Sequence, residues 1–217
     1  MNKKKFKEYL DKFGLIPKDF NERFLYLIHD LKITINDLEI IKNKIIKLIN
    51  AKWHSINIVF YFIPKATPRA RSSRFTKSFY VKDAFDYSTL FKQFIDATED
   101  IQGIITTPCR FYCELFFPTP NQMSKIEKVL SELKLLYAVP RPDWDNAGKT
   151  YSDMVQTHLI LDDCIIIDGS VKKFYSIKPR IIIRIEYMDK YDCSFNKKRV
   201  EKWKTYKSDD INEKESI

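Results

Sequence analysis

The spacing of apolar residues changes once along this chain, near residue 53, and that change limits what it can fold into. Before it, apolar side chains recur every three or four positions, as in amphipathic helices. After it, β-branched and aromatic runs alternate with helical segments. We therefore predict a helical extension over 1–52, a strand-and-helix domain over 53–188, and a polar tail over 189–217 that is disordered near its end.

The helical extension is predicted to contain three short helices. Gly14 ends the first, Pro17 suits the first turn of the second, and Thr34 with Asp37 forms a capping box for the third. Such a segment is either a helix-turn-helix reader of DNA or a packing or dimerisation bundle. The bundle is favoured, because no group of Arg, Asn and Gln marks a base-reading face.

Within 53–188 the pattern predicts strands and helices in alternation. The last two strands are expected to be joined by a short hairpin loop over Ser176–Pro179. The predicted elements are a buried strand at 56–63, a helix at 83–99, a strand at 110–117, a helix at 121–138, a helix beginning at Asp145, and strands at 164–175 and 180–188.

Two classes of protein are excluded by composition. No apolar run approaches the roughly 20 residues that a membrane helix requires, so we expect no membrane association. Four cysteines and three histidines complete no zinc spacing, which favours reduced thiols inside a cell.

The charge distribution is the first indication of function. The chain has a net charge of +9, which favours a polyanionic partner. The acidic segment, residues 143–168, has six aspartates and one lysine and therefore a net charge of −5, so the remainder carries +14. Bases that bind phosphates together with carboxylates that bind a metal are what a nuclease needs.

The basic arm, residues 64–77, is a candidate phosphate-binding loop. Prolines stiffen it, and Arg69, Arg71, Arg74 and Lys77 protrude from it. A merely solvated loop is the alternative.

The acidic segment begins with two carboxylates that could share a cation. Pro140 and Pro142 favour an extended approach, in which Asp143 and Asp145 point to the same side. Asp145 is also a good N-cap, and Lys149 and Asp153 follow it along one helical stripe. Asp162 and Asp163 precede an apolar strand, and a helix packed antiparallel on its sheet can return Asp163 to the first pair. Carboxylate oxygens suit Mg²⁺ or Mn²⁺.

This combination resembles the RusA family of Holliday junction resolvases. The family pattern P-D-x-D-N-x-x-K is matched by Pro142–Asn146 and Lys149, and its D-D pair by Asp162-Asp163. Asp153 matches an acid that commonly follows the lysine, and Lys173 matches the lysine at the end of the following strand. The likeness covers about residues 55–188, and family members are usually shorter, so both ends are additions.

The resemblance implies an α/β (α+β) fold, namely a small mixed sheet with helices on one side. It also implies a cytoplasmic homodimer, in a bacterial cell or phage-infected host, that resolves branched DNA by paired nicks in recombination and repair. Mg²⁺, with Mn²⁺ as a substitute, is the expected cofactor. The implied metal-binding and catalytic acids are Asp143, Asp145 and Asp163, and Asp162 is a further metal candidate. Lys149 is also required for catalysis, and Asn146 and Asp153 support the site. The expected DNA-binding residues are Arg69, Arg71, Arg74, Lys77 and Lys173.

Two other functions stay open at this stage. One is a flap- or fork-type nuclease. The other is a DNA-binding accessory protein that keeps the fold without cleavage; a missing carboxylate would indicate it, and none is missing.

Overall fold

The computed structural model describes residues 3–12, 14, 31–67, 70–73, 76–80, 87–156, 158–191, 193, 197–198 and 200–201. Contacts divide the chain into an N-terminal unit, Met1–Lys52 with Lys190–Asp192, and a sheet unit, Trp53–Asp189 with Cys193–Ile217. The predicted helix beginning at Pro17 and most of the predicted tail lie outside the described residues. Among the described residues, no helix is both long enough and apolar enough to cross a bilayer.

The N-terminal unit has a small core of its own. Its described helices are α1 (Lys3–Lys12) and α3 (Ile35–Ile49). Phe6 and Leu10 of α1 and Leu38 of α3 are buried together. The predicted capping box is present at the start of α3, where the Thr34 backbone N–H donates to the Asp37 carboxylate at 2.8 Å. The Thr34 hydroxyl also donates to the Asp37 carboxylate, at 2.7 Å, and these two hydrogen bonds hold the pKa of Asp37 below its usual value.

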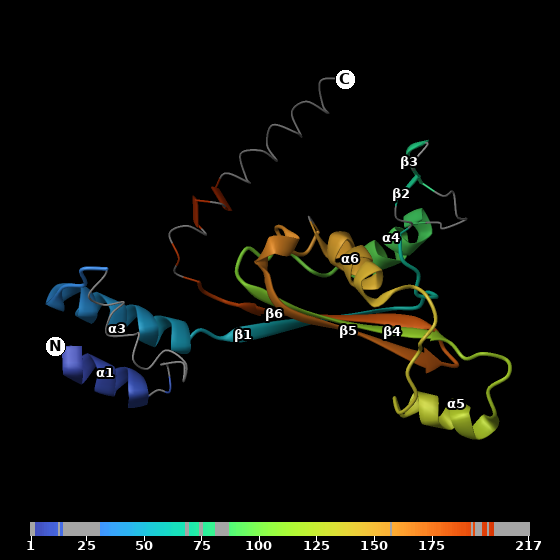
Figure 1. The fold of residues 1–217 in the computed structure, drawn as a ribbon, viewed down its shortest axis with the longest axis horizontal. Coiled ribbons are helices and arrows are strands. Elements are labelled where there is room, and N and C mark those ends of the chain that lie inside the picture. The colour runs from blue at the N-terminus through green and yellow to red at the C-terminus, as the bar shows by residue number, and fades with distance from the viewer. Residues whose placement is uncertain are drawn as a thin grey trace. The chain divides into compact units, whose positions relative to one another are not determined.

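A four-stranded mixed sheet organises the sheet unit (Figure 1). Its order is β1-β6-β4-β5, with β4 and β5 parallel and the other pairs antiparallel. The sheet and its helices confirm the predicted α+β class. The strands are β1 (Trp53–Phe60), β4 (Cys109–Pro118), β5 (Ile166–Ser176) and β6 (Arg180–Met188).

The predicted hairpin between the last two strands is wrong. β5 and β6 do not pair with each other, because β4 lies between them and pairs with both. The link therefore crosses the end of β4, a span of about 10 Å between strand axes, which a few extended residues can cover. Local turn chemistry is the same in both arrangements, so the sequence pattern could not separate them.

One face of the sheet carries the main core. In β4, Cys109, Phe111, Cys113 and Leu115 alternate inward, and in β6 Ile181, Ile183 and Ile185 are fully buried. The helices α4 (Tyr87–Asp96) and α6 (Trp144–Val155) cover this face (Figure 1). β1, predicted to be buried, is only half buried, because it is an edge strand with one face open.

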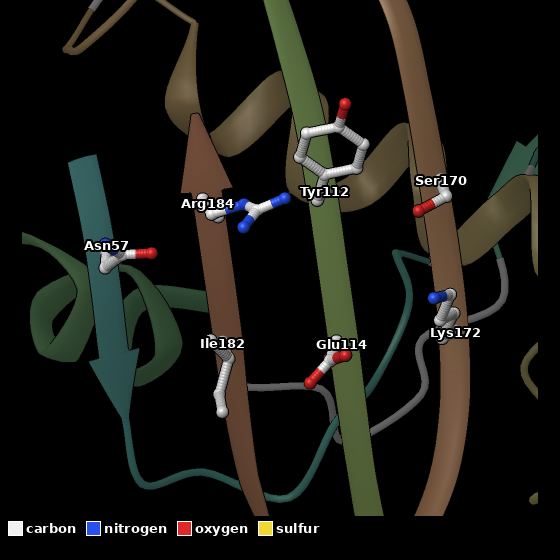
Figure 2. A pocket seen from close by; sticks show the side chains of 7 residues that line it. All are labelled: Asn57, Tyr112, Glu114, Ser170, Lys172, Ile182 and Arg184. Atoms are coloured by element: carbon white, nitrogen blue, oxygen red, sulfur yellow. The ribbon is translucent and has the colours of Figure 1, made fainter. Parts of the chain in front are cut away.

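The opposite face of the sheet is mostly polar. Side chains from all four strands surround a hollow of about 240 Å³, with Tyr112 and Glu114 at its centre (Figure 2). The Arg184 guanidinium lies 4.8 Å from the Tyr112 ring centroid. Glu186 accepts from Arg110 and forms an ion pair with Arg184. Two arginines on this face therefore share one carboxylate.

Helix α5 (Lys125–Glu132) lies at one end of that second face, where Phe116 and Phe174 stack. The helices are thus not all on one side, and α5 is shorter than the predicted 121–138. Its carboxyl end is held in place because Glu132 accepts from Ser176 Oγ and from the Ile177 backbone N–H.

The basic arm contains a short hairpin instead of the predicted loop. β2 (Ala70–Ser73) pairs with β3 (Thr76–Tyr80), and the register shifts between Arg71 and Ser73. Alternating polar residues hid this pairing, since neither strand carries the apolar run that marks a strand in sequence.

Candidate active site

The segment that leads into α6 is attached to the outer edge of β5. The Lys173 ammonium donates to the carbonyl oxygens of Pro140 at 2.6 Å and Pro142 at 2.8 Å. The Trp144 indole N–H donates to the Val171 carbonyl oxygen at 2.8 Å. The extended approach expected through Asp145 ends at Asp143, because α6 begins at Trp144. These bonds determine where Asp143 enters the helix.

Asp143, and not Asp145 as predicted, is the N-cap of α6. Its carboxylate makes no capping hydrogen bond, so its oxygens are not used by the helix end. Asp145 lies in the first turn, and its Oδ1 accepts from the Asn146 backbone N–H at 2.8 Å. The helix begins earlier than the pattern indicated, because the prolines end at residue 142.

Lys149 joins the two halves of the acidic segment. Its ammonium lies 2.7 Å from Asp153 Oδ1, one turn along the helix, and 3.1 Å from Asp163 Oδ2, beyond the helix. The side chain of Lys149 is 57% exposed, so the ion pairs face solvent. The hydrogen bonds to Asp153 and then Asp163 raise the pKa of Lys149, which keeps it a cation at neutral pH.

A short 3₁₀ turn, η2 (Asp163–Ile165), delivers Asp163 to this position. Asp162 is its N-cap, and Asp162 Oδ1 accepts from the Cys164 backbone N–H at 2.9 Å. The two neighbouring aspartates therefore have different surroundings. Asp162 closes the turn, while Asp163 is directed toward Lys149.

The carboxylates have the right chemistry for Mg²⁺, but they do not form a closed metal cage. Within the described part of the chain, no three His, Cys, Asp or Glu side chains converge to hold a metal ion. The Lys149 ammonium is the cation at Asp163. The uncapped carboxylate of Asp143 and the exposed one of Asp163 supply the oxygen donors that a hard divalent ion prefers.

A group of hydrogen bonds that sequence reasoning missed joins the start of the basic arm to α6. The Asn146 amide donates to the Thr67 carbonyl oxygen at 3.1 Å, and the Thr67 backbone N–H donates to Thr150 Oγ1 at 2.9 Å. The Tyr151 hydroxyl donates to the Lys65 carbonyl oxygen at 2.9 Å and accepts from the Lys65 N–H at 3.1 Å. The only advance signal was the i, i+4 spacing of 146 and 150, which puts them on one helical face.

The predicted DNA-binding residues are described only in part. Arg69 and Arg74 lie outside the described residues, while Arg71 and Lys77 fall in the backbones of β2 and β3. Lys173 is well placed, but its ammonium holds the approach to α6, as described above. Contact of these five residues with DNA stays a prediction.

Comparison with known proteins found two similarities. A family model described as endodeoxyribonuclease RusA matches residues 62–186. The chain is also similar to the uncharacterized protein YqaN of Bacillus subtilis (strain 168), with 30% identity over 135 residues. That alignment covers 60% of this chain and 94% of YqaN.

Proposed function

Because the chain belongs to the RusA family of endodeoxyribonucleases, we propose that it resolves four-way DNA junctions by paired, Mg²⁺-dependent nicks. It would act as a homodimer in DNA recombination and repair within a bacterial cytoplasm, of phage, prophage or chromosomal origin. A dimer suits the substrate, since a two-fold symmetric junction requires two equivalent cuts.

The observation that carries this proposal is the ion pair between Lys149 and Asp163. It joins residues 14 positions apart, one from each half of the acidic segment, across two different elements. If the two halves of the acidic segment were only solvated turns, there would be no reason for both to contact the exposed Lys149 ammonium. Asp143, Asp145 and Asp163 would hold the metal, with Asp162 occupied in its turn.

Each of the chain's own residues has a distinct task in this reaction. Mg²⁺, when bound, would polarise the scissile phosphate and lower the pKa of an attacking water. Lys149 would place a permanent positive charge beside the phosphate, and Asp153 would orient the ammonium through its 2.7 Å ion pair. Lys173 and Trp144 hold the helix entrance, so that the carboxylate of Asp143 is presented at a set position.

Substrate choice tests the proposal. Purified protein is offered four-way junctions, flaps and linear duplexes in Mg²⁺, and the cut sites are mapped on both strands. We expect symmetric paired nicks in the junction. Preferred cutting of flaps would instead indicate a flap- or fork-type nuclease, and tight junction binding without cuts in Mg²⁺ or Mn²⁺ would indicate an accessory protein.

Substitution separates the proposed carboxylates from the others. Asp143→Asn and Asp163→Asn should abolish cleavage and leave junction binding intact or tighter, since a negative charge facing phosphate is removed. Asp168→Asn is the matched control. Asp168 belongs to the same acidic segment, but it accepts from the Tyr112 hydroxyl at 3.5 Å on the polar sheet face. Equal cleavage by Asp163→Asn and the parent would refute the shared metal site.

A further inference from the structure

The hydrogen bonds between the basic arm and α6 are buried on their α6 side. Thr150 is 1% exposed and Tyr151 is fully buried, so water cannot readily replace their partners. The hydroxyls of Thr67 and Thr150 lie 3.0 Å apart, and Thr150 Oγ1 also donates to the Asn146 carbonyl oxygen. An opened contact would leave the buried Thr150 hydroxyl without the Thr67 N–H that donates to it.

The contact is also adjacent to the proposed catalytic stripe on α6. Asn146 directly follows Asp145, and Thr150 directly follows Lys149. Successive residues on a helix are 100° apart, so the stripe of Asp145, Lys149 and Asp153 and the arm-binding face are neighbouring faces of one rigid rod. The backbone at residues 65–67 is thereby fixed relative to the carboxylates.

We propose that Asn146, Thr150 and Tyr151 are positioning residues, which hold the basic arm at a set place beside the catalytic stripe so that the strand bound by the arm reaches the carboxylates in register. The catalytic half of this inference rests on the proposed function. The half that concerns the arm and DNA binding does not, and can be measured without cleavage.

Position 150 allows a nearly isosteric test. Thr150→Val removes the hydroxyl that accepts from the Thr67 N–H, and Thr150→Ser restores it. Limited trypsin digestion reports the state of the arm, because Arg69, Arg71, Arg74 and Lys77 are all sites of trypsin cleavage. We expect trypsin to cleave the arm about 3- to 10-fold faster in Thr150→Val than in the parent, the range for one lost hydrogen bond to a half-buried group. Thr150→Ser should remain near the parent.

DNA measurements test whether the fixed arm matters for substrate. Thr150→Val and Tyr151→Phe should weaken junction binding by about tenfold, because the arm must be ordered again on binding. Single-turnover cleavage with saturating protein should fall further than binding does, since misplaced phosphate contacts cost rate as well as affinity. Thr150→Ser should rescue both binding and cleavage. If Thr150→Ser and Thr150→Val have the same melting temperature, a purely structural defect at this site would not predict that rescue.

Ser152→Ala is the matched control on the same helix. Ser152 Oγ donates to the Lys149 carbonyl oxygen and, within the described residues, makes no bond to the arm. Trypsin digestion of the arm and junction binding should therefore match the parent in Ser152→Ala. If Thr150→Val fails to fold, Thr67→Val is the second variant, since it removes the arm-side hydroxyl from a half-buried loop position. We expect the same changes in arm digestion and junction binding, but smaller ones.

The outcomes separate the two proposals. Faster arm digestion with weaker junction binding supports the positioning role, even if the parent never cuts, in which case only the proposed cleavage fails. Arm digestion and binding within twofold of the parent for Thr150→Val and Tyr151→Phe would overturn it, even if the parent resolves junctions. Faster digestion with unchanged binding and unchanged cleavage would also overturn it.

Discussion

At the scale of single residues, Lys149 is the side chain for which chemistry and stability can be told apart. An exposed ion pair contributes only about 0.3–0.5 kcal/mol to folding. Loss of one preorganised electrostatic group at a reacting phosphate costs about 10²–10³ in rate. We expect Lys149→Ala to fold and bind junctions while single-turnover cleavage falls by that factor. A thermal melt beside the rate measurement checks both quantities.

Lys149→Arg is expected to rescue cleavage only in part, because a planar guanidinium places its charge differently from a compact ammonium. The pH dependence follows from the sign of the shift. The pKa of Lys149 is raised above its ordinary 10.5, so its ion pairs are fully present below that pH and are lost only above it. A loss of cleavage rate near pH 8 that disappears in Lys149→Arg would contradict this account. A cleavage rate for Lys149→Ala within threefold of the parent would also contradict it.

At the scale of elements, the basic arm and helix α3 are two cationic segments that could bind DNA, and salt dependence separates them. If the arm contacts phosphates, replacing Arg69, Arg71 and Arg74 together with Ala should lower the slope of log affinity against log salt by about 2.7, or roughly 0.9 per contact. Junctions of different sequence should be affected alike.

The matched control removes the same charge from α3, through Lys42→Ala, Lys44→Ala and Lys47→Ala. If the N-terminal unit is a packing or dimerisation bundle, this slope should change little. A larger change from α3 than from the arm would revive the helix-turn-helix interpretation, and an unchanged slope for the arm variant would leave the arm a solvated loop.

At the scale of the whole molecule, the two units have separate cores, and stability should divide between them. Leu38 is 1% exposed in the N-terminal core, and Ile183 is fully buried in the sheet unit. Truncation of a buried Leu or Ile to Ala costs about 2–5 kcal/mol. We expect Leu38→Ala to lower amide protection in α3 and leave β4 and the cleavage rate unchanged, whereas Ile183→Ala lowers protection in β4.

Hydrogen exchange on the full chain measures both regions in one experiment. Equal loss of protection in β4 from Leu38→Ala would show one cooperative unit instead of two.

Local pattern alone determined most elements and the composition of the candidate site. Strand β6 was predicted with its observed bounds, and β4 to within a residue at each end. Both were recognisable because the alternation of buried and exposed positions along a strand follows from the residue types. The acidic segment was recognisable because six aspartates and one lysine at fixed spacings are rare in a chain of net charge +9.

Only the tertiary structure decided which segments become neighbours. The insertion of β4 between β5 and β6, the pairing of Lys149 with Asp163, and the attachment of Thr67 to Thr150 all join residues distant in sequence. Side-chain spacing reports which face a residue occupies on its own element, but not which other element packs against that face. That choice is made by burial of the whole core, to which every strand and helix contributes at once.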